Sequence, residues 1–410
     1  MQNTGLKYGT KTLCFYLPEK AEVLKLKEPV LTVDPATFEV DLAALISRLK
    51  PALKDVAVVV ADKTRLCAYS EYLPGLVKVL EDFGVGKKNI VFYIAYGTHQ
   101  NQSDAESIHT YGSVFRDYRF VHHDCDDAAL FKKMGETSRG TPVLVRRDIL
   151  NAGFLITFGA VTHHYFAGYG GGRKLLFPGL GFRKAVYHNH GLFLDKTSGC
   201  LAGACRPGSL EGNPLAGDID EAVDFRPADL AIHGIVDSHG KVCRLITGSG
   251  KTGFKVACRE QGRNCEIKQD EPFDLVAASC GGYPKDINFI QSHKAIHNAA
   301  GFVRDKGILI VFARCRDGIG SDTFLPWFEM GGYRAAFNRL AQNYAGNGGT
   351  ALAMMEKTKR IRIHLVTDLP EKVCLKMGVA RISVKQAGKL LQACSGKVGI
   401  IPNASLLVKV

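Results

Sequence analysis

Short apolar runs alternate along the chain with longer amphipathic stretches. Val56–Ala61 (VAVVVA) and Ile90–Ala95 (IVFYIA) are continuous apolar runs, a pattern typical of strands buried in a parallel sheet. Between them, Leu76–Phe83 has helical spacing, with Pro74 and Gly75 as a start signal. The strand pattern recurs at Phe154–Phe158, Leu230–His233, Leu275–Ala278, Ile308–Phe312 and Ile363–Val366. Strands separated by helical stretches predict an α/β fold with mostly parallel sheets covered by helices.

A polar stretch, Gln261–Pro272, interrupts this pattern before a new strand begins at Leu275. We therefore predict an N-terminal α/β domain over residues 1–268 and a C-terminal α/β domain over residues 269–410. The last apolar run, Ser405–Val410, could return to either domain. Two lobes with the active site in the cleft between them is the geometry expected for a small-molecule site.

Composition narrows the class of protein. With 46% hydrophobic and 23% charged residues, the chain has too much apolar content to be mainly disordered. The net charge of +13 is compatible with nucleic acid, an anionic membrane or small acidic ligands. Basic residues are dispersed and not interleaved with aromatic residues, which argues against nucleic acid. No apolar run is long enough to span a membrane, and the N-terminus lacks the layout of a signal peptide. The 12 cysteines include no C-x-x-C pair, so we expect reduced thiols and a cytoplasmic protein.

Chemically versatile side chains follow three of the predicted strands. Asp62, Thr64 and Arg65 follow the first, His99 follows the second, and His163 and His164 follow the third. Because ligands bind at the carboxyl ends of the strands in open α/β sheets, these residues predict a site on one rim. A single histidine in such a loop can instead be structural, held by hydrogen bonds.

The stretch from Tyr165 to Gly181 (YFAGYGGGRKLLFPGLG) is unusually rich in glycine. Four glycines within Gly168–Gly172 leave room where something bulky must approach the backbone. Lys174 follows and opens onto the apolar residues Leu175–Phe177. A lysine in apolar surroundings has a lowered pKa and can act as a nucleophile or covalent anchor. The alternative is a solvated lysine at the start of a helix.

Two further pairs of residues are candidates. His188 and His190 (YHNH) would lie on one side of a strand or irregular loop and could serve a metal, or they could be structural. Without carboxylate or thiolate partners, such a metal would need ligands from a cofactor. Gln291 and Lys294 are three residues apart, hence on one face if helical, where they suit an anion and a carbonyl. They could equally form an ordinary first turn of a helix.

Taken in order, these segments resemble the lactate racemase family, which uses a nickel-pincer nucleotide. The matching motifs are D-x-T-R at Asp62–Arg65, G-T-H at Gly97–His99, H-Y-F-A-G-x-x-G-G-x-K at His164–Lys174, a histidine at His190, G-N-P at Gly212–Pro214, and Gln291-x-x-Lys294. They extend over residues 60–295. Departures are His163 where proline often stands, Gln100 after His99, Leu66 after Arg65, and Trp327 in an unmatched context.

The resemblance implies a cofactor and a role for each residue. The cofactor is pyridinium-3-thioamide-5-thiocarboxylic acid mononucleotide carrying Ni. Lys174 would form its covalent thioamide tether, and His190 would complete the nickel coordination. His99 and His164 would be the catalytic acid/base residues, with His163 as a competitor of His164. The remaining implied residues are Asp62, Thr64, Arg65, Gly171 and Gly172 at the cofactor, and Arg65, Gln291 and Lys294 at the substrate.

The resemblance also implies an activity. The chain is expected to be a 2-hydroxyacid racemase or epimerase that acts by reversible hydride transfer through a 2-keto acid. Its expected partners are a small anionic 2-hydroxy acid and the cofactor-biosynthesis proteins needed for maturation, with no nucleic acid and no membrane. The alternatives are a same-fold enzyme with another redox or isomerase activity and a non-catalytic binder of nucleotide or organic acid.

Overall fold

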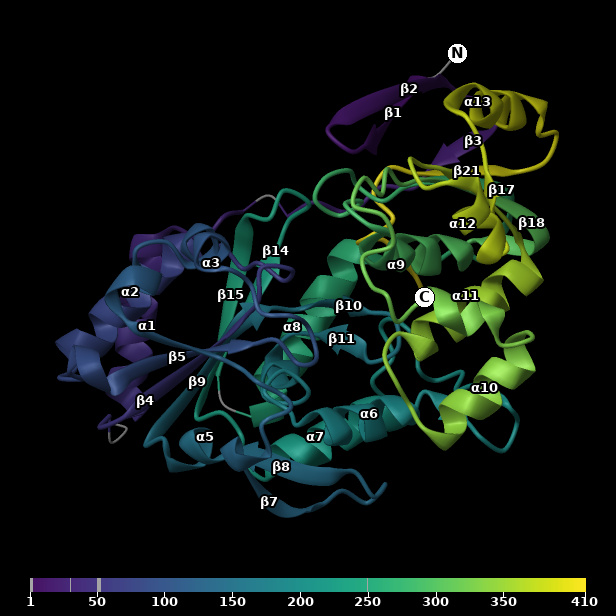
Figure 1. The fold of residues 1–410 in the computed structure, drawn as a ribbon. Helices are drawn as coiled ribbons and strands as arrows, with labels where there is room; N and C mark the ends of the chain where they lie inside the picture. The colour runs from purple at the N-terminus through teal and green to yellow at the C-terminus, as the bar shows by residue number, and fades with distance from the viewer. Residues whose placement is uncertain (1–2, 30, 50–52, 249) are drawn as a thin grey trace. The chain divides into compact units, whose positions relative to one another are not determined.

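The computed structural model describes residues 3–29, 31–49, 53–248 and 250–410, which are drawn in Figure 1. The chain forms two compact units. Unit 1 contains residues 1–27, 191–208 and 263–410, and unit 2 contains residues 28–190 and 209–262. Each unit is built on a six-stranded, mostly parallel sheet with helices packed on it, so the predicted α/β fold is confirmed.

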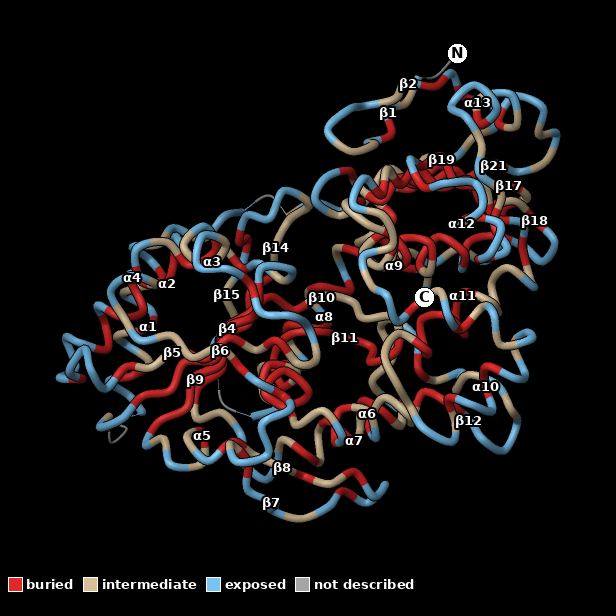
Figure 2. Tube along the Cα trace, in the orientation of Figure 1, coloured by how far each residue is buried: buried red, intermediate tan, exposed pale blue. Residues whose placement is uncertain are grey.

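The sheet of unit 2 has the strand order β15-β14-β9-β4-β5-β6. Its strands are β4 (Val56–Ala61), β5 (Ile90–Ala95), β6 (Arg119–His122), β9 (Phe154–Ala160), β14 (Leu230–Val236) and β15 (Val242–Gly248). All neighbours are parallel except the edge pair β14 and β15. Every residue of β4 and β9 is buried, as Figure 2 shows, because helices cover both faces of a parallel sheet.

Helices and small hairpins complete unit 2. The helices are α1 (Pro35–Leu49), α2 (Tyr69–Asp82), α3 (Asp104–Tyr111), α4 (Val114–Asp117), α5 (Arg147–Asn151), α6 (Arg183–Gly191), α7 (Pro214–Asp224) and α8 (Gly250–Cys265), with short 3-10 turns η1 (Lys87–Asn89), η2 (Ala128–Leu130) and η3 (Gly172–Leu175). The hairpins are β7 (Phe131–Glu136) with β8 (Pro142–Arg146), and β10 (Thr162–His164) with β11 (Gly168–Gly170). The predicted start of α2 at Pro74 is wrong, because the helix begins at Tyr69 and carries Pro74 inside it.

The sheet of unit 1 has the order β20-β19-β18-β17-β21-β3, and all its neighbours are parallel. Its strands are β3 (Ala21–Val23), β17 (Phe273–Ser279), β18 (Val303–Phe312), β19 (Arg362–Val366), β20 (Ala380–Arg381) and β21 (Val398–Ile401). Alternate residues of β17 and β18 enter two separate cores. Leu309 and Val311 face a core shared with α9 (Phe289–Ala300) and α11 (Gly348–Arg360). Ile310 and Phe312 face a core shared with the hairpin β1 (Asn3–Tyr8) and β2 (Lys11–Tyr16) and with α13 (Val384–Ala393).

The other elements of unit 1 are short. They are α10 (Tyr333–Gln342), α12 (Glu371–Lys376), η4 (Leu325–Glu329) and two small ladders, β12 (Leu194–Asp195) with β13 (Cys200–Leu201) and β16 (Glu266–Ile267) with β22 (Val408–Lys409). Across the described part of the chain, no helix is both long and apolar enough to cross a membrane. All 12 cysteines are free thiols, and most are buried.

The two units are not contiguous in sequence, whereas the hydrophobic pattern predicts one boundary near residue 268. The difference comes from the N-terminus. Strand β3 pairs in parallel with β21, and the β1–β2 hairpin packs on the same sheet, so residues 1–27 belong with the C-terminal part. The final strand β22 also stays in unit 1, where it pairs with β16. Strand pairing over such separations leaves no periodic signal in the local sequence.

Candidate active site

The loop after β4 carries a buried carboxylate, Asp62, that is held from two sides. Its Oδ1 accepts hydrogen bonds from the Thr64 backbone N–H (2.9 Å) and the Thr64 hydroxyl (2.6 Å). Its Oδ2 lies 2.9 Å from Nδ1 of His99. Burial alone raises the pKa of Asp62, but the hydrogen bonds and charges of His99, Thr64 and Arg65 outweigh burial and hold that pKa well below its ordinary value. Asp62 is therefore an ionised acceptor at neutral pH.

The loop after β5 brings His99 to this carboxylate. Because β4 and β5 are adjacent parallel strands, their following loops share one edge of the sheet. The Gly97 N–H donates to the Gly179 carbonyl (2.7 Å), and the His99 N–H donates to the Tyr96 carbonyl (3.1 Å). Gln102 ties the two loops together by accepting a hydrogen bond from the Lys63 N–H (2.8 Å). The His99 side chain is 53% exposed, so an incoming molecule can reach it.

The hairpin after β9 separates the two neighbouring histidines. His163 is opposite Tyr169 and His164 is opposite Gly168, and successive side chains of a strand point to opposite faces. The His163 ring lies 4.7 Å from that of Tyr169, which belongs to a small apolar core. The His164 ring instead lies 4.6 Å from that of Phe166. His163 and His164 therefore face different surroundings.

Phe166 is the point where three predicted site residues meet. Its buried ring lies 4.6 Å from the His164 ring, 5.0 Å from the His190 ring and 5.5 Å from Nζ of Lys174. Burial, followed by the charges of Lys174 and His99, lowers the pKa of His190 to about 3. His190 is thus a neutral imidazole at physiological pH, the form that binds metals.

Lys174 lies in η3, directly after the glycine-rich turn, and is partly exposed. Burial and the guanidinium groups of Arg65 and Arg173 hold the pKa of Lys174 well below its ordinary value. Within residues 3–29, 31–49, 53–248 and 250–410, its Nζ makes no hydrogen bond or ion pair. An amine with no carboxylate beside it and two cations nearby is suited to act as a nucleophile.

The glycines before Lys174 are required by packing within the protein. Gly171 and Gly172 have φ values of 73° and 52°. A side chain at Gly171 would collide with the Ala160 carbonyl, and one at Gly172 would collide with the Phe254 ring. Packing within the protein thus accounts for these glycines without a bulky ligand. Their contact with a cofactor stays a prediction.

Arg173 was not predicted from the sequence as a site residue, yet it anchors the glycine-rich turn. Its side chain is buried, forms an ion pair with Asp220 of α7, and places its guanidinium 4.5 Å from the ring centre of Phe254 on α8. Arg173 occupies a variable position of the motif, and nothing in the local sequence distinguishes it from a solvated arginine. In the structure, Arg173 contacts Asp220 of α7 and Phe254 of α8, whereas Nζ of the next residue, Lys174, lies near the Phe166 ring.

The predicted pairing of His188 with His190 is wrong. Both lie in α6, where two residues are separated by about 200° around the helix axis. His188 instead contacts the Thr141 hydroxyl through Nδ1 (2.9 Å), and that hydroxyl donates to the buried Asp218 (2.7 Å). Asp218 also accepts a hydrogen bond from Nδ2 of Asn189 (2.8 Å). This network holds α6, and of the two histidines only His190 contacts the Phe166 ring among the described residues.

Gln291 and Lys294 lie in unit 1, at the start of α9. Asn288 caps this helix by accepting a hydrogen bond from the Gln291 N–H (2.9 Å). Nζ of Lys294 donates to Oε1 of Gln291 (2.7 Å), which confirms that the two side chains share one helical face. Their role toward a substrate stays a prediction.

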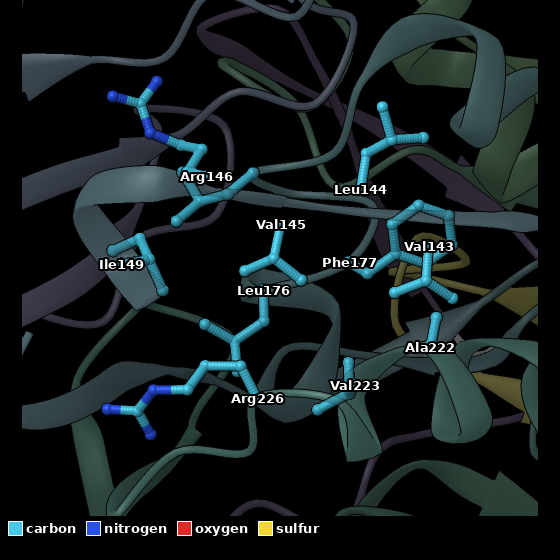
Figure 3. Close-up of a pocket in the computed structure, with 11 residues that line it drawn as sticks. Val143, Leu144, Val145, Arg146, Ile149, Leu176, Phe177, Ala222, Val223 and Arg226 are labelled. Atoms are coloured by element: carbon cyan, nitrogen blue, oxygen red, sulfur yellow. The ribbon is translucent and has the colours of Figure 1, made fainter. Parts of the chain in front are cut away.

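Two small cavities of unit 2 lie beside the Lys174 turn. Leu176 and Phe177 line the first, whose volume is about 30 Å³. Figure 3 shows aliphatic side chains such as Val145 and Val223 around it, with the guanidinium groups of Arg146 and Arg226 pointing away. The second, about 60 Å³, is lined by Arg173, His233 and Phe254 among others. Neither is lined by His99, His164, Lys174 or His190, and the described residues contain no cluster of three metal-binding side chains.

Comparisons with known proteins find relatives that match most of the chain. Residues 8–200 match the lactate racemase N-terminal domain, and residues 268–347 match the lactate racemase C-terminal domain. A lactate racemase of Thermoanaerobacterium thermosaccharolyticum is 26% identical over 340 residues, covering 80% of this chain and 78% of that protein. A lactate racemase of Lactiplantibacillus plantarum is 25% identical over 272 residues, 66% of this chain and 62% of that protein.

Solved structures show the same fold. The lactate racemase apoprotein of T. thermosaccharolyticum superposes with a TM-score of 0.88 at 22% identity, covering all of both chains. A protein from Thermotoga maritima superposes with a TM-score of 0.69 at 18% identity, covering 93% of this chain and 100% of that one.

Proposed function

Because the chain belongs to the lactate racemase family, we propose that it is an isomerase, a racemase or epimerase of 2-hydroxy acids. The observation that supports this most is the meeting of His164, His190 and Lys174 around Phe166. A protein that only binds a nucleotide or an organic acid needs neither an amine kept without an ion pair nor a neutral, half-buried imidazole on the same phenylalanine ring.

The residues of unit 2 fit the family's nickel-pincer nucleotide. Lys174 is a partly exposed amine whose pKa is lowered, as the tether to the thioamide requires. His190 offers one neutral imidazole to the metal. By the family resemblance, the cofactor itself would supply the remaining nickel ligands. Asp62, Thr64, Arg65, Gly171 and Gly172 are proposed to complete the cofactor pocket.

Bound there, the cofactor supplies an electron-deficient acceptor for the hydride on the substrate α carbon, which no amino acid offers. The α C–H bond is too weakly acidic for easy removal as a proton, so the chain needs to manage only the hydroxyl proton. We propose that His99 takes this proton at Nε2, while the buried carboxylate of Asp62 holds its Nδ1–H and stabilises the imidazolium that forms. His164 is proposed as the second acid/base residue.

The substrate carboxylate is proposed to bind cations. The family resemblance suggests Arg65, Gln291 and Lys294 for this role, because arginine and lysine donate charge-assisted hydrogen bonds to carboxylates. Within unit 1, the Gln291 side chain positions the Lys294 ammonium group. Such contacts select a small anionic 2-hydroxy acid. They do not distinguish lactate from malate, aryl-lactates, longer aliphatic hydroxy acids or sugar acids.

The proposal is tested by expressing the chain together with the enzymes that make the cofactor. We expect a covalent mass adduct mapped to Lys174 and about one nickel per chain. Incubation with single enantiomers of 2-hydroxy acids, followed by chiral chromatography, should then identify the substrate. Absence of both adduct and nickel contradicts the proposal. A loaded protein that converts no enantiomer but oxidises or isomerises another acid identifies a same-fold enzyme of different activity.

A further inference from the structure

We infer that His99 and His164 are held in opposite neutral tautomers, so that the resting site offers one proton acceptor and one proton donor at the Nε2 positions. The inference follows from which hydrogen bond each Nδ1 makes, and only its consequence for turnover rests on the proposed function. Such a site differs from one in which the two histidines are interchangeable bases.

The tautomer of His99 is set by Asp62. An ionised carboxylate can only accept hydrogen bonds, and Asp62 Oδ2 lies 2.9 Å from Nδ1 of His99. Nδ1 must therefore carry the proton, which leaves the lone pair of a neutral His99 on Nε2. The carboxylate cannot turn away easily, because its Oδ1 accepts two hydrogen bonds from Thr64. His99 thus presents a proton acceptor.

The tautomer of His164 is set by the backbone of its own turn. The Ala167 N–H can only donate a hydrogen bond, and it donates to Nδ1 of His164 at 3.3 Å. Nδ1 must therefore be bare, which leaves the proton of a neutral His164 on Nε2. The contact is local to the tight β10–β11 hairpin, whose register places His164 opposite Gly168. His164 thus presents a proton donor and cannot accept a proton at Nε2 in this state.

The two enantiomers of a substrate then meet different starting states. One presents its hydroxyl group to His99, which can take the proton directly. The other presents its hydroxyl group to His164, which must first lose the proton on Nε2 to solvent and gain one on Nδ1. That exchange breaks the hydrogen bond from Ala167, because Nδ1–H and the Ala167 N–H are both donors. By microscopic reversibility, turnover in the opposite direction ends with the same exchange in reverse, which restores the proton on Nε2 of His164 and the hydrogen bond from Ala167.

The equilibrium constant of racemisation limits how the rates of its two directions can differ. Enantiomers are equally stable in water, so the equilibrium constant of racemisation is one. The kcat/KM values of the two directions must therefore be equal. The tautomer exchange of His164 belongs to the catalytic cycle in both directions and favours neither enantiomer in kcat/KM. Loss of one ordinary hydrogen bond corresponds to roughly a five-fold change, so we expect the resting tautomer of His164 to outnumber the exchanged tautomer by about five-fold or more.

The direct test is long-range ¹H–¹⁵N NMR of the full-length apoprotein labelled with ¹⁵N-histidine, at a pH where neutral imidazoles dominate. His99→Gln and His164→Gln each remove one set of signals and so assign them. We expect an Nδ1–H pattern for His99 and an Nε2–H pattern for His164. The same tautomer at both residues, or rapid averaging at either, overturns the inference.

Two variants probe the cause. Asp62→Asn removes the obligate acceptor, and we expect His99 to lose its single tautomer while His164 keeps its own. Thr64→Val is the matched control, because it removes one hydrogen bond to Asp62 but leaves the carboxylate and should leave the His99 pattern unchanged. An unchanged His99 in Asp62→Asn contradicts the inference. Because the NMR experiment needs no cofactor, a failure of the proposed racemase activity would be seen separately in the loaded enzyme.

Discussion

The two units differ sharply in how they carry charge. Unit 2 has 25 Lys and Arg residues and 25 Asp and Glu residues, so its formal charge is zero. Unit 1 has 28 Lys and Arg residues against 15 Asp and Glu residues, so it carries the whole net charge of +13. Yet the histidines and the lysine of the proposed chemistry all lie in unit 2, and unit 1 contributes Gln291 and Lys294. The net charge of the chain therefore does not locate the proposed chemistry.

Local charge within unit 2 is more informative. Residues 151–190 contain four Lys or Arg residues and no Asp or Glu. Arg173 obtains its counter-ion from α7 and Arg183 obtains one from Asp126, whereas Lys174 forms no ion pair among the described residues. A unit with no net charge can thus hold one amine without a counter-ion, and burial together with the charges of Arg65 and Arg173 depresses the pKa of Lys174.

The largest expected effect comes from removing that amine. Lys174→Ala should abolish the covalent mass adduct and the bound nickel, because no other nucleophile replaces the tether. The matched control is Lys184→Ala, an exposed lysine of the same acid-free segment, which should load normally. Intact-mass spectrometry and nickel analysis after coexpression measure both. An adduct that persists in Lys174→Ala would place the tether elsewhere.

The next effect concerns the histidines of unit 2. His99→Gln and His164→Gln should each lower the racemisation rate by roughly 10² to 10⁴, the usual contribution of a general acid or base, while the adduct remains. His163→Gln should have a much smaller effect, because His163 packs against Tyr169 on the other face of the hairpin. Racemisation rates of loaded, mass-verified variants provide the measurement. Full activity in His164→Gln would transfer the role to His163.

A change in unit 1 should act on substrate binding and not on loading. Lys294→Ala removes one ammonium group proposed to hold the substrate carboxylate, and we expect KM to rise by about 10-fold to 100-fold, as for one charge-assisted hydrogen bond. Lys294→Arg should recover part of this loss. Adduct formation should be normal in both variants. Loss of the adduct in Lys294→Ala would show that Lys294 is needed for cofactor loading and not only for substrate binding.

The smallest effect concerns acid stability, where the two units should behave alike. Burial lowers the pKa of His233 in unit 2 to about 4. Burial is also the largest of the causes that lower the pKa of His293 in unit 1 to about 3. Each pKa is lower in the folded protein than the unfolded value near 6.5, so each contribution to stability is complete above about pH 6.5 and is lost as pH falls toward the folded value. At pH 5 the loss should be roughly 2 kcal/mol per histidine.

Urea unfolding at pH 7.5 and pH 5 tests this expectation. His233→Leu should reduce the pH dependence of unfolding in unit 2, because the ring nitrogens of His233 have no hydrogen-bond partner among the described residues. The control is His109→Gln, at an exposed histidine of α3, which should leave the pH dependence unchanged. An equal pH dependence in wild type and His233→Leu would contradict the expected protonation cost.

Much of the fold and many site positions could be predicted from local sequence. The apolar runs at Val56–Ala61 and Ile90–Ala95 are strands with the predicted bounds, because burial on both faces requires continuous apolar residues. The polar residues Asp62 and His99 follow those strands and meet at one edge of the sheet. Periodicity and the position of a residue after a strand are properties of a few neighbouring residues, so the sequence carries them directly.

The sequence by itself determined the α/β class, the central strands and the set of candidate residues. Tertiary structure decided which of two adjacent histidines faces Phe166, how far apart His188 and His190 lie, and where Arg173 finds its counter-ion. It also decided that β3 joins the sheet of unit 1, and that the net charge of +13 lies in that unit. These outcomes depend on contacts between segments far apart in the chain, and packing and electrostatics settle such contacts only once the chain has folded.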